Sequence, residues 1–237
     1  MSGAFIVLCF AMAVVLVAIV AEFVLEVVRI PFRIEKDLGG PEALCRTFAT
    51  AGPLGVRVAL WRAGIPYRSV RRPRVPLVKW LPKEWRGVTR IDGAYYFVDA
   101  FGRPCGALVV LPRFVDLRPR NEYVQGVVGR WGDAEGLDCD GGHVLAYCLG
   151  GDDSRLNTIP EAKVLNRGQR REAEERGWKR ASRYRASGGL VYYVRIEYRD
   201  DRTIIASHIA IMTYAVRAGR MVSSERFENT NRPAQAA

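Results

Sequence analysis

The chain has 237 residues, 49% of them hydrophobic, which leaves room for one ordinary globular domain and an accessory segment. Its 36 Lys and Arg against 25 Asp and Glu give a formal net charge of +11, and the excess is mostly arginine. The planar guanidinium suits phosphate, so this balance favours a polyanionic partner, either nucleic acid or an anionic membrane surface.

The cysteines are interpreted as ordinary buried thiols. None of the five forms a Cys-x-x-Cys pair. The spacing of Cys139, His143 and Cys148 resembles part of a zinc site, but no second ligand pair completes it. A disulfide framework would need an oxidising compartment, which nothing else in the sequence establishes.

The N-terminus carries a long apolar segment. Ala4 to Ala21 is unbroken by polar residues, and at about 1.5 Å per residue it nearly spans a hydrocarbon core of about 30 Å. No Lys or Arg precedes it, and Ile19-Val20-Ala21 is a poor cleavage site. We therefore predict that residues 1–29 anchor the protein in a membrane, with the bacterial inner membrane favoured. A cleaved signal peptide, which would make the protein secreted, is the alternative. Arg29 and Arg33 would keep the C-terminal part in the cytoplasm.

Residues 30–87 are predicted to be a Pro/Arg-rich linker. Prolines interrupt any long helix there: Pro31, Pro41, Pro53, Pro66, Pro73, Pro76 and Pro82. Ala43 to Ala51 favours a short helix, and Val56 to Trp61 a strand. The basic run Arg68 to Arg74 is interpreted as solvated linker. The alternative is an arm that faces phosphate or lipid.

From Val88 onward the sequence predicts an α+β domain with an antiparallel sheet, extending to residue 229. Ala94–Asp99 and Gly106–Leu111 are expected to form a hairpin, and residues 118–132 to be loop with some strand. A principal helix is expected near residues 166–185. Two further strands are expected over residues 189–198 and 203–212, and residues 230–237 are expected to be a disordered tail.

The central motif begins with Asp140-Gly-Gly-His143, which we interpret as a Gly-Gly turn that presents the histidine to an apolar run. Asn157-Thr-Ile-Pro160 and Leu165-Asn-Arg-Gly168 follow, and then a charged helix. Phosphodiester hydrolysis needs a base for water, which neutral histidine can be, and a cation that takes up charge on phosphate. Mg²⁺ is a hard ion that takes oxygen ligands, so one asparagine oxygen can hold it if waters and phosphate complete its shell.

These motifs resemble the DNA/RNA non-specific endonucleases, which are ββα-metal nucleases, and the variety found in toxins of type VII secretion in particular. The likeness covers roughly Val88 to Asn229. Tyr96 to Arg103 resembles the family's opening hairpin, and Tyr123 and Gln125 fit the segment before its histidine.

The resemblance implies a role for each matching residue. His143 would be the general base, and Asn166 the metal ligand for Mg²⁺, with Mn²⁺ as a second candidate. Asn157 would hold the loop or the histidine in place, Glu174 would support metal-bound water, and Asp140 would order the turn before the histidine. Taken alone, Asn157 also fits a loop-ordering residue and Glu174 a solvated helix acid.

The chain departs from the family at two places. Better-studied relatives have arginine where this chain has Gly141, so another cation must meet charge on the substrate phosphate; the candidates are Arg167, Arg120 and Arg180. An aromatic usually follows the Asn-Arg-Gly turn, where this chain has Gln169-Arg170.

The resemblance implies a metal-dependent endonuclease that hydrolyses DNA or RNA with little sequence preference, with a toxin effector and a cognate immunity protein as expectations. The alternatives are a membrane-tethered nucleic-acid-binding protein without cleavage activity and a membrane-associated protein with neither activity. His208, in an alternating strand pattern, is expected to be structural.

Overall fold

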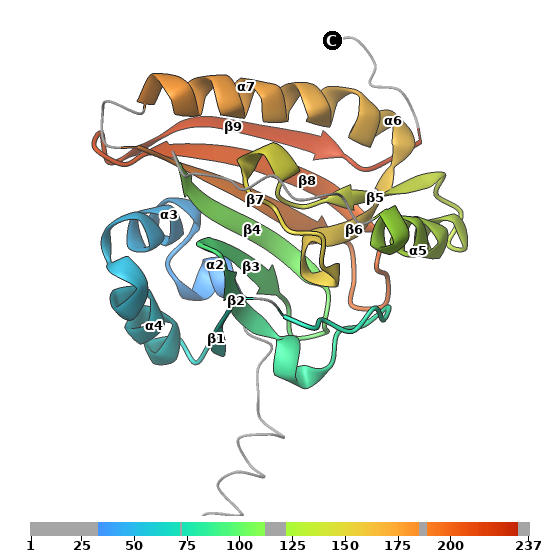
Figure 1. Cartoon of the computed structure of the whole chain (residues 1–237), viewed down its shortest axis with the longest axis horizontal. Helices are drawn as coiled ribbons and strands as arrows, with labels where there is room; N and C mark the ends of the chain where they lie inside the picture. Colours follow the sequence, from blue (N-terminus) through green and yellow to red (C-terminus); the bar gives the residue numbers. More distant parts are fainter. Residues whose placement is uncertain (1–32, 72, 112–121, 185–188, 232–237) are drawn as a thin grey trace, which may run out of the picture. The chain divides into compact units, whose positions relative to one another are not determined.

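The computed structural model describes residues 33–71, 73–111, 122–184 and 189–231, which belong to a unit that begins at Arg33. Its main sheet is built from β1 (Tyr67–Val70), β2 (Gly87–Ile91), β3 (Ala94–Val98), β4 (Pro104–Leu111), β7 (Leu190–Tyr198), β8 (Ala206–Ala215) and β9 (Arg220–Glu228), which lie side by side in that order (Figure 1). Only the β1–β2 pair is parallel among these strands. The prediction of an α+β fold with an antiparallel sheet is confirmed.

The predicted hairpin and the two late strands are present. β3 and β4 pair antiparallel, as do β7 and β8. All five residues of β3 are buried, so this strand is a continuous apolar run rather than an alternating one. β8 begins three residues later than expected, at Ala206, and extends to Ala215, because it pairs along the whole length of β7.

A second, two-stranded sheet carries the central motif. β5 (Cys139–His143) pairs antiparallel with β6 (Thr158–Ala162), and α6 (Lys163–Arg167) and α7 (Gln169–Tyr184) follow directly. The expected Gly-Gly turn is wrong: Gly141 and Gly142 are paired residues of β5, and the strand ends at His143. The apolar run after it forms a short 3-10 helix, η2 (Tyr147–Leu149), and a second one, η3 (Arg155–Asn157), precedes β6.

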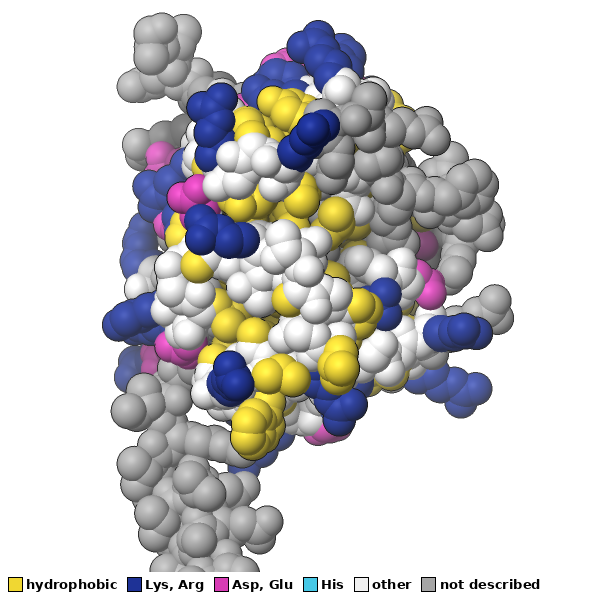
Figure 2. All heavy atoms as spheres, turned by 90° about the vertical axis from the view of Figure 1, so that its left-hand side faces the viewer, with side chains coloured by type: hydrophobic (Ala, Val, Ile, Leu, Met, Phe, Trp, Pro, Cys, Tyr) yellow, Lys and Arg dark blue, Asp and Glu magenta, His cyan; other side chains and the backbone are white. Residues whose placement is uncertain are grey.

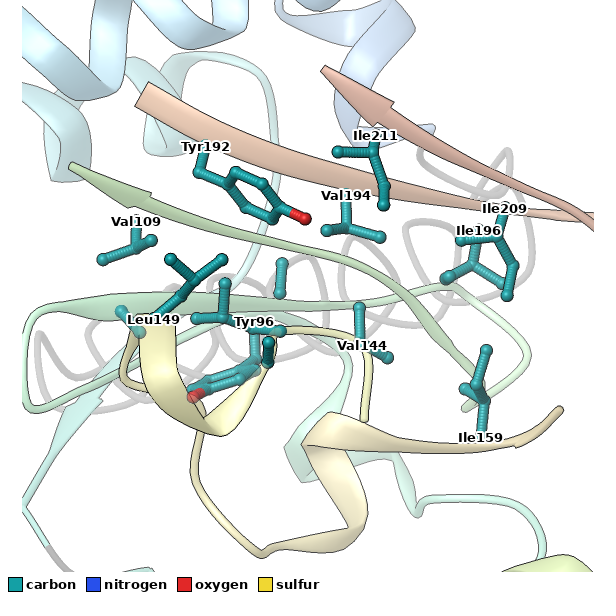
Figure 3. Packing of buried hydrophobic residues seen from close by; sticks show 14 of the residues in the cluster. Tyr96, Val109, Val144, Leu149, Ile159, Tyr192, Val194, Ile196, Ile209 and Ile211 are labelled. Carbon is teal, nitrogen blue, oxygen red and sulfur yellow. The ribbon is translucent and has the colours of Figure 1, made fainter. Parts of the chain in front are cut away.

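The apolar run buries the motif against the main sheet. Figure 3 shows side chains from the motif meeting side chains from the sheet strands: Val144, Leu149 and Ile159 on one side, and Tyr96, Val109, Tyr192, Val194, Ile196, Ile209 and Ile211 on the other. Helix α7 continues this layer, and its glycine at position 177 lets it approach closely, since a Cβ there would lie 2.5 Å from the Tyr192 ring. The core therefore fixes β5 and α7 to the same sheet.

Residues 122–133 form helix α5 (Glu122–Asp133) instead of the loop with some strand that we expected. Three glycines argue against a helix by propensity. Here two of them permit contact: a Cβ on Gly129 would lie 3.2 Å from the Cys139 carbonyl oxygen, and one on Gly132 would lie 2.4 Å from the Cys139 sulfur. Packing against β5 thus outweighs the propensity.

The predicted linker over residues 30–87 is wrong for its described part. It holds α2 (Ile34–Asp37), α3 (Pro41–Thr50), α4 (Gly52–Arg62), β1 and a 3-10 helix, η1 (Lys83–Trp85). The expected short helix is α3, but the expected strand at residues 56–61 is part of α4. Val56 and Leu60 are both fully buried, and their four-residue spacing places them on one helix face. Pro41 and Pro53 lie in the first turns of their helices, where proline removes no helical hydrogen bond.

Helices α2 and α3 cover the face of the main sheet opposite to the motif. Phe48 of α3 packs edge-on against Tyr95 at 4.7 Å between ring centroids. The Tyr193 hydroxyl donates to Glu35 of α2 at 2.9 Å, whereas its neighbour Tyr192 contacts α7. Because successive strand residues point to opposite faces, the sheet is buried on both sides.

The segment before β2 is also fixed to the motif. Buried Arg155 donates to the carbonyl oxygens of Val78 at 3.1 Å and Lys79 at 2.9 Å, and to that of Thr158 at 2.6 Å. A domain boundary at residue 88 would separate Arg155 from two of these partners. The folded unit therefore includes the residues before Val88.

Across the described ranges, no helix is long and apolar enough to cross a membrane. The predicted anchor at residues 1–29 lies outside them, as do residues 232–237 of the predicted tail. On the side that carries α3 and α4, Figure 2 shows hydrophobic side chains at the surface among lysines and arginines. Leu54 and Trp61 of α4 contribute to the exposed apolar surface, at 74% and 77% exposure.

Candidate active site

His143 stands at the C-terminal end of β5, and its side chain is only 13% exposed. The Nε2 atom lies 3.3 Å from the Asp153 carboxylate and 3.3 Å from the Gln125 amide nitrogen. Gln125 belongs to α5, and Asp153 to the loop before η3. The imidazole is therefore held between a helix and a loop, with a carboxylate at one ring nitrogen.

Asn157 is fully buried, and its amide joins the two segments that flank the site. Its Oδ1 accepts from the Leu145 amide at 2.7 Å, and its Nδ2 donates to the Leu145 carbonyl at 3.0 Å and to the Asp152 carbonyl at 2.7 Å. Its own carbonyl accepts from the Val144 amide at 2.7 Å. These bonds fix the chain directly after His143, which is the arrangement that a holding role for Asn157 requires.

Arg170 is the residue through which α7 contacts β5. Its guanidinium is 1% exposed and donates to the carbonyl oxygens of His143 and Val144. It also forms a 2.7 Å ion pair with Glu161 of β6, which is fully buried, and lies 3.4 Å from Glu174. Arg170 thus links the backbone of His143 to the carboxylate of Glu174.

Charge in this cluster is balanced between buried partners. Burial raises the pKa of Glu161, and Arg170 opposes that shift. Burial acts against the charge on Arg170, but Glu161 and Glu174 outweigh it and raise its pKa. The Arg170 guanidinium therefore stays charged, and it is the group on which an ionised Glu161 depends.

Asp140 connects the start of β5 to α6. It accepts two hydrogen bonds from Arg167, at 2.8 and 2.9 Å, and one from Asn166 Nδ2 at 3.3 Å. Burial acts against ionisation of Asp140, but the bonds from Arg167 and Asn166 outweigh it and lower its pKa. We expected Asp140 to order a turn before His143. Instead, it lies in β5 and orients the Asn166 amide.

This orientation bears on metal binding. Because Nδ2 of Asn166 faces Asp140, its Oδ1 points elsewhere, and no donor among the described residues bonds to it. An amide oxygen is a ligand that Mg²⁺ accepts. The described ranges hold no cluster of three or more His, Cys, Asp or Glu residues that could bind a metal ion. The amide oxygen of Asn166 is therefore a donor of the kind that a hard cation accepts.

The glycine at position 141 has a structural cause. A Cβ there would lie 2.3 Å from the Gln125 carbonyl oxygen, so the backbone of α5 occupies the space of any side chain. A Cβ on Gly142 would lie 2.0 Å from Glu161 Oε2. An arginine at position 141 is incompatible with this packing of α5.

The three candidate phosphate-binding arginines have different locations. Arg167 lies beside Asn166, is 68% exposed, and pairs with Asp140. Arg180 lies near the other end of α7, where it donates to Ser223 of β9 at 2.6 Å. Arg120 lies outside the described residues. Of the two that the structure describes, Arg167 is the one that lies with the predicted metal ligand.

Sequence reasoning missed Asp153, Gln125 and Arg170 as site residues. Asp153 lies in a polar loop that nothing in the motif distinguishes, and Gln125 precedes its partner by 18 residues. Arg170 could have been noticed in the sequence, because Gln169-Arg170 stands where an aromatic residue usually follows the Asn-Arg-Gly turn. His208, expected to be structural, lies on β8 and contacts Ser207 at 3.2 Å.

Asn157→Ala is expected to lower the free energy of unfolding by at least about 2 kcal/mol, because it leaves buried backbone groups of Leu145 and Asp152 without partners. Urea denaturation of both proteins measures this. Asn166→Ala is the matched control, since that partly exposed amide makes one 3.3 Å bond. Equal losses in the two variants would contradict the holding role of Asn157.

Asp152 predicts a pH dependence of stability. Burial raises its pKa from 3.8 to about 6, against the hydrogen bonds from Ser154. Because the folded-state value is the higher one, the contribution of Asp152 is fully present below about pH 4 and is lost as the pH rises through about 6. Asp152→Asn mimics the protonated form at every pH. The unfolding free energy of the wild type minus that of the variant should therefore fall between about pH 4 and about pH 7 in urea titrations. A constant difference would contradict this prediction.

Comparison with known proteins gives the family. A model of the DNA/RNA non-specific endonuclease family matches residues 84–216, more than half of the chain. Solved structures of NucA from Streptococcus agalactiae, one with no metal bound and one with magnesium ion bound, are each similar at 16% sequence identity. Each comparison covers 58% of this chain and 70% of that chain, with a TM-score of 0.40. None of the curated proteins matches. Because the family model matches more than half of the chain, the chain belongs to the DNA/RNA non-specific endonuclease family.

Proposed function

We propose that the chain is a Mg²⁺-dependent endonuclease that hydrolyses DNA or RNA phosphodiesters without sequence preference, with His143 as the general base. The observation that carries the proposal is the way Arg170 and Asp140 connect the site. Arg170 holds the His143 carbonyl and contacts Glu174, and Asp140, three residues before His143, orients Asn166. Arg170 thus links the backbone of the proposed base to the supporting carboxylate, and Asp140 orients the proposed metal ligand.

The side chains support a division of labour. The His143 imidazole takes the proton of the attacking water, which a neutral ring can do near pH 7. Asn166 would hold a divalent cation through its amide oxygen, and Glu174 would accept hydrogen bonds from that cation's waters. A bound Mg²⁺ would supply positive charge for the phosphate and the leaving oxygen. Arg167 directly follows Asn166 in the chain and is exposed, so it is the cationic side chain that we assign to a substrate phosphate.

Metal dependence is the direct test. The purified full chain is incubated with supercoiled plasmid and with structured RNA, in Mg²⁺, in Mn²⁺ and in EDTA. We expect cleavage of nucleic acid in Mg²⁺, none in EDTA, and recovery when Mg²⁺ is returned in excess. Asn166→Ala should raise the Mg²⁺ concentration needed for half-maximal cleavage by about 10-fold or more, the size expected for loss of a metal-binding contact.

The matched control is Asn229→Ala, which removes another asparagine that bonds to backbone groups near β6 but not at the site. Its Mg²⁺ requirement should equal that of the wild type. Salt-dependent binding of plasmid without cleavage in any metal would favour the binding protein instead. Cleavage that survives EDTA would reject the metal-dependent mechanism.

A further inference from the structure

The carboxylate beside His143 has no role in the mechanism above. Asp153 Oδ1 lies 3.3 Å from Nε2, and the two side chains are 19% and 13% exposed. A surface ion pair contributes little when both partners are mobile and solvated. Here both groups are mostly shielded from water, so their arrangement has a larger effect on the ring.

The loop that carries Asp153 is fixed on both sides. The Asp152 amide donates to the Tyr96 hydroxyl at 3.0 Å, and the Asp152 carbonyl accepts from Asn157 at 2.7 Å. On the other side, the Ser154 hydroxyl donates to Asp152 Oδ1 at 3.1 Å and accepts from the Leu156 amide at 3.2 Å. Tyr96 belongs to the main sheet and is fully buried. Asp153 is therefore presented to His143 by a built loop.

Asn157 joins the two backbone segments that carry His143 and Asp153. The same side chain bonds to Leu145, two residues after His143, and to Asp152, directly before Asp153. One buried amide therefore fixes the backbone beside both residues. This gives a reason for its full hydrogen bonding that stability alone does not.

We infer that Asp153 is a positioning residue, which accepts a hydrogen bond from Nε2–H of His143 and so leaves Nδ1 as the atom that takes the proton from water. A carboxylate can only accept hydrogen bonds, so the ring nitrogen facing it carries the proton. In the neutral ring the other nitrogen is then the acceptor. When Nδ1 takes a proton, the adjacent carboxylate stabilises the imidazolium.

Gln125 offers the opposite arrangement. As placed, its amide nitrogen lies 3.3 Å from Nε2 and would donate to it, which would put the proton on Nδ1. The two ends of a glutamine amide are interchangeable by rotation, so Gln125 can equally present its oxygen to Nε2–H. Charge decides between the two: a hydrogen bond to an ionised acceptor is roughly twice as strong as a neutral one.

The catalytic role of this tautomer rests on the proposed function, but the tautomer itself can be measured without any activity. The chain has two histidines, so the full chain labelled with ¹⁵N-histidine gives two sets of ring signals, and His208→Gln identifies those of His143. Two-bond ¹H–¹⁵N correlation spectra of the neutral ring show which nitrogen carries the proton. We expect a protonated Nε2 and an unprotonated Nδ1 in the wild type.

Asp153→Asn is the variant that removes the charge and keeps the shape. The His143 signals should move toward an average of the two tautomers while those of His208 stay in place. In the cleavage assay, kcat should fall by about 10- to 100-fold with little change in KM, as for other groups that orient a functional side chain. Asp201→Asn removes the same charge from an exposed residue after β7, and it should change neither the His143 signals nor kcat.

Two outcomes would overturn the inference: a wild-type His143 with its proton on Nδ1, or an Asp153→Asn protein with the wild-type tautomer and kcat. The wild-type spectrum decides the first even if the variant fails to fold. A wild type that shows the expected tautomer but cuts nothing would reject the proposed function and leave the Asp153–His143 pairing standing.

Discussion

His143→Ala is expected to lower kcat by about 10²- to 10⁴-fold, the usual contribution of a general base, while KM and nucleic-acid affinity change little. The alanine variant keeps the backbone carbonyl that Arg170 holds, so β5 and α7 stay joined. It removes only the imidazole, which contacts Asp153 and Gln125. The loss should therefore fall on the chemical step. Single-turnover cleavage of a labelled duplex and a binding titration in EDTA measure the two parts separately.

His208→Ala is the matched control, because it removes the other histidine of the chain from a partly exposed site on β8. It should cut at the wild-type rate. Equal rates for His143→Ala and the wild type would show that another group activates the water. A parallel loss of DNA binding and of the folded state in His143→Ala would assign the histidine to structure.

Arg170→Met is expected to lower the free energy of unfolding by about 3–5 kcal/mol, the cost of leaving a buried charge without its partner. Glu161 is fully buried, and its Oε1 has no hydrogen-bond partner among the described residues. The carbonyls of His143 and Val144 also lose their donor. Urea unfolding near pH 7 measures the loss, and cleavage should fall as well because His143 loses its backbone support.

A double-mutant cycle separates the ion pair from the rest. Glu161→Gln in the Arg170→Met background should recover part of the lost stability, because the buried carboxylate is removed. Arg171→Met is the exposed control on the same helix, where the side chain is 73% exposed and lies 3.6 Å from Glu175, so it should change stability by less than about 1 kcal/mol. If Arg170→Met lost no more stability than Arg171→Met, the central place of Arg170 in the site would be contradicted.

The local pattern of the sequence determined the hairpin, the late strands and α7. In each, an apolar run or a charged helical stretch is bounded by glycine or polar residues, so short-range preferences and the final packing agree. His143, Asn157 and Asn166 were predicted from the resemblance of their motifs to those of the family. Such motifs can be found in a sequence because β5, β6 and α6 follow one another in the chain.

Packing between distant segments decided the remainder. Residues 56–61 alternate as a strand would, yet burial of Val56 and Leu60 on one face makes them helical. The glycines of α5 argue against a helix until β5 lies against them, and that contact also explains why position 141 carries no side chain.

The same distinction applies to the site. The sequence by itself determined the family motif and its histidine, because these depend on neighbours along the chain. The partners of that histidine come from α5, from the loop before η3 and from α7. Only the tertiary structure brings these together, because each contact depends on a close approach of backbones that no local preference encodes.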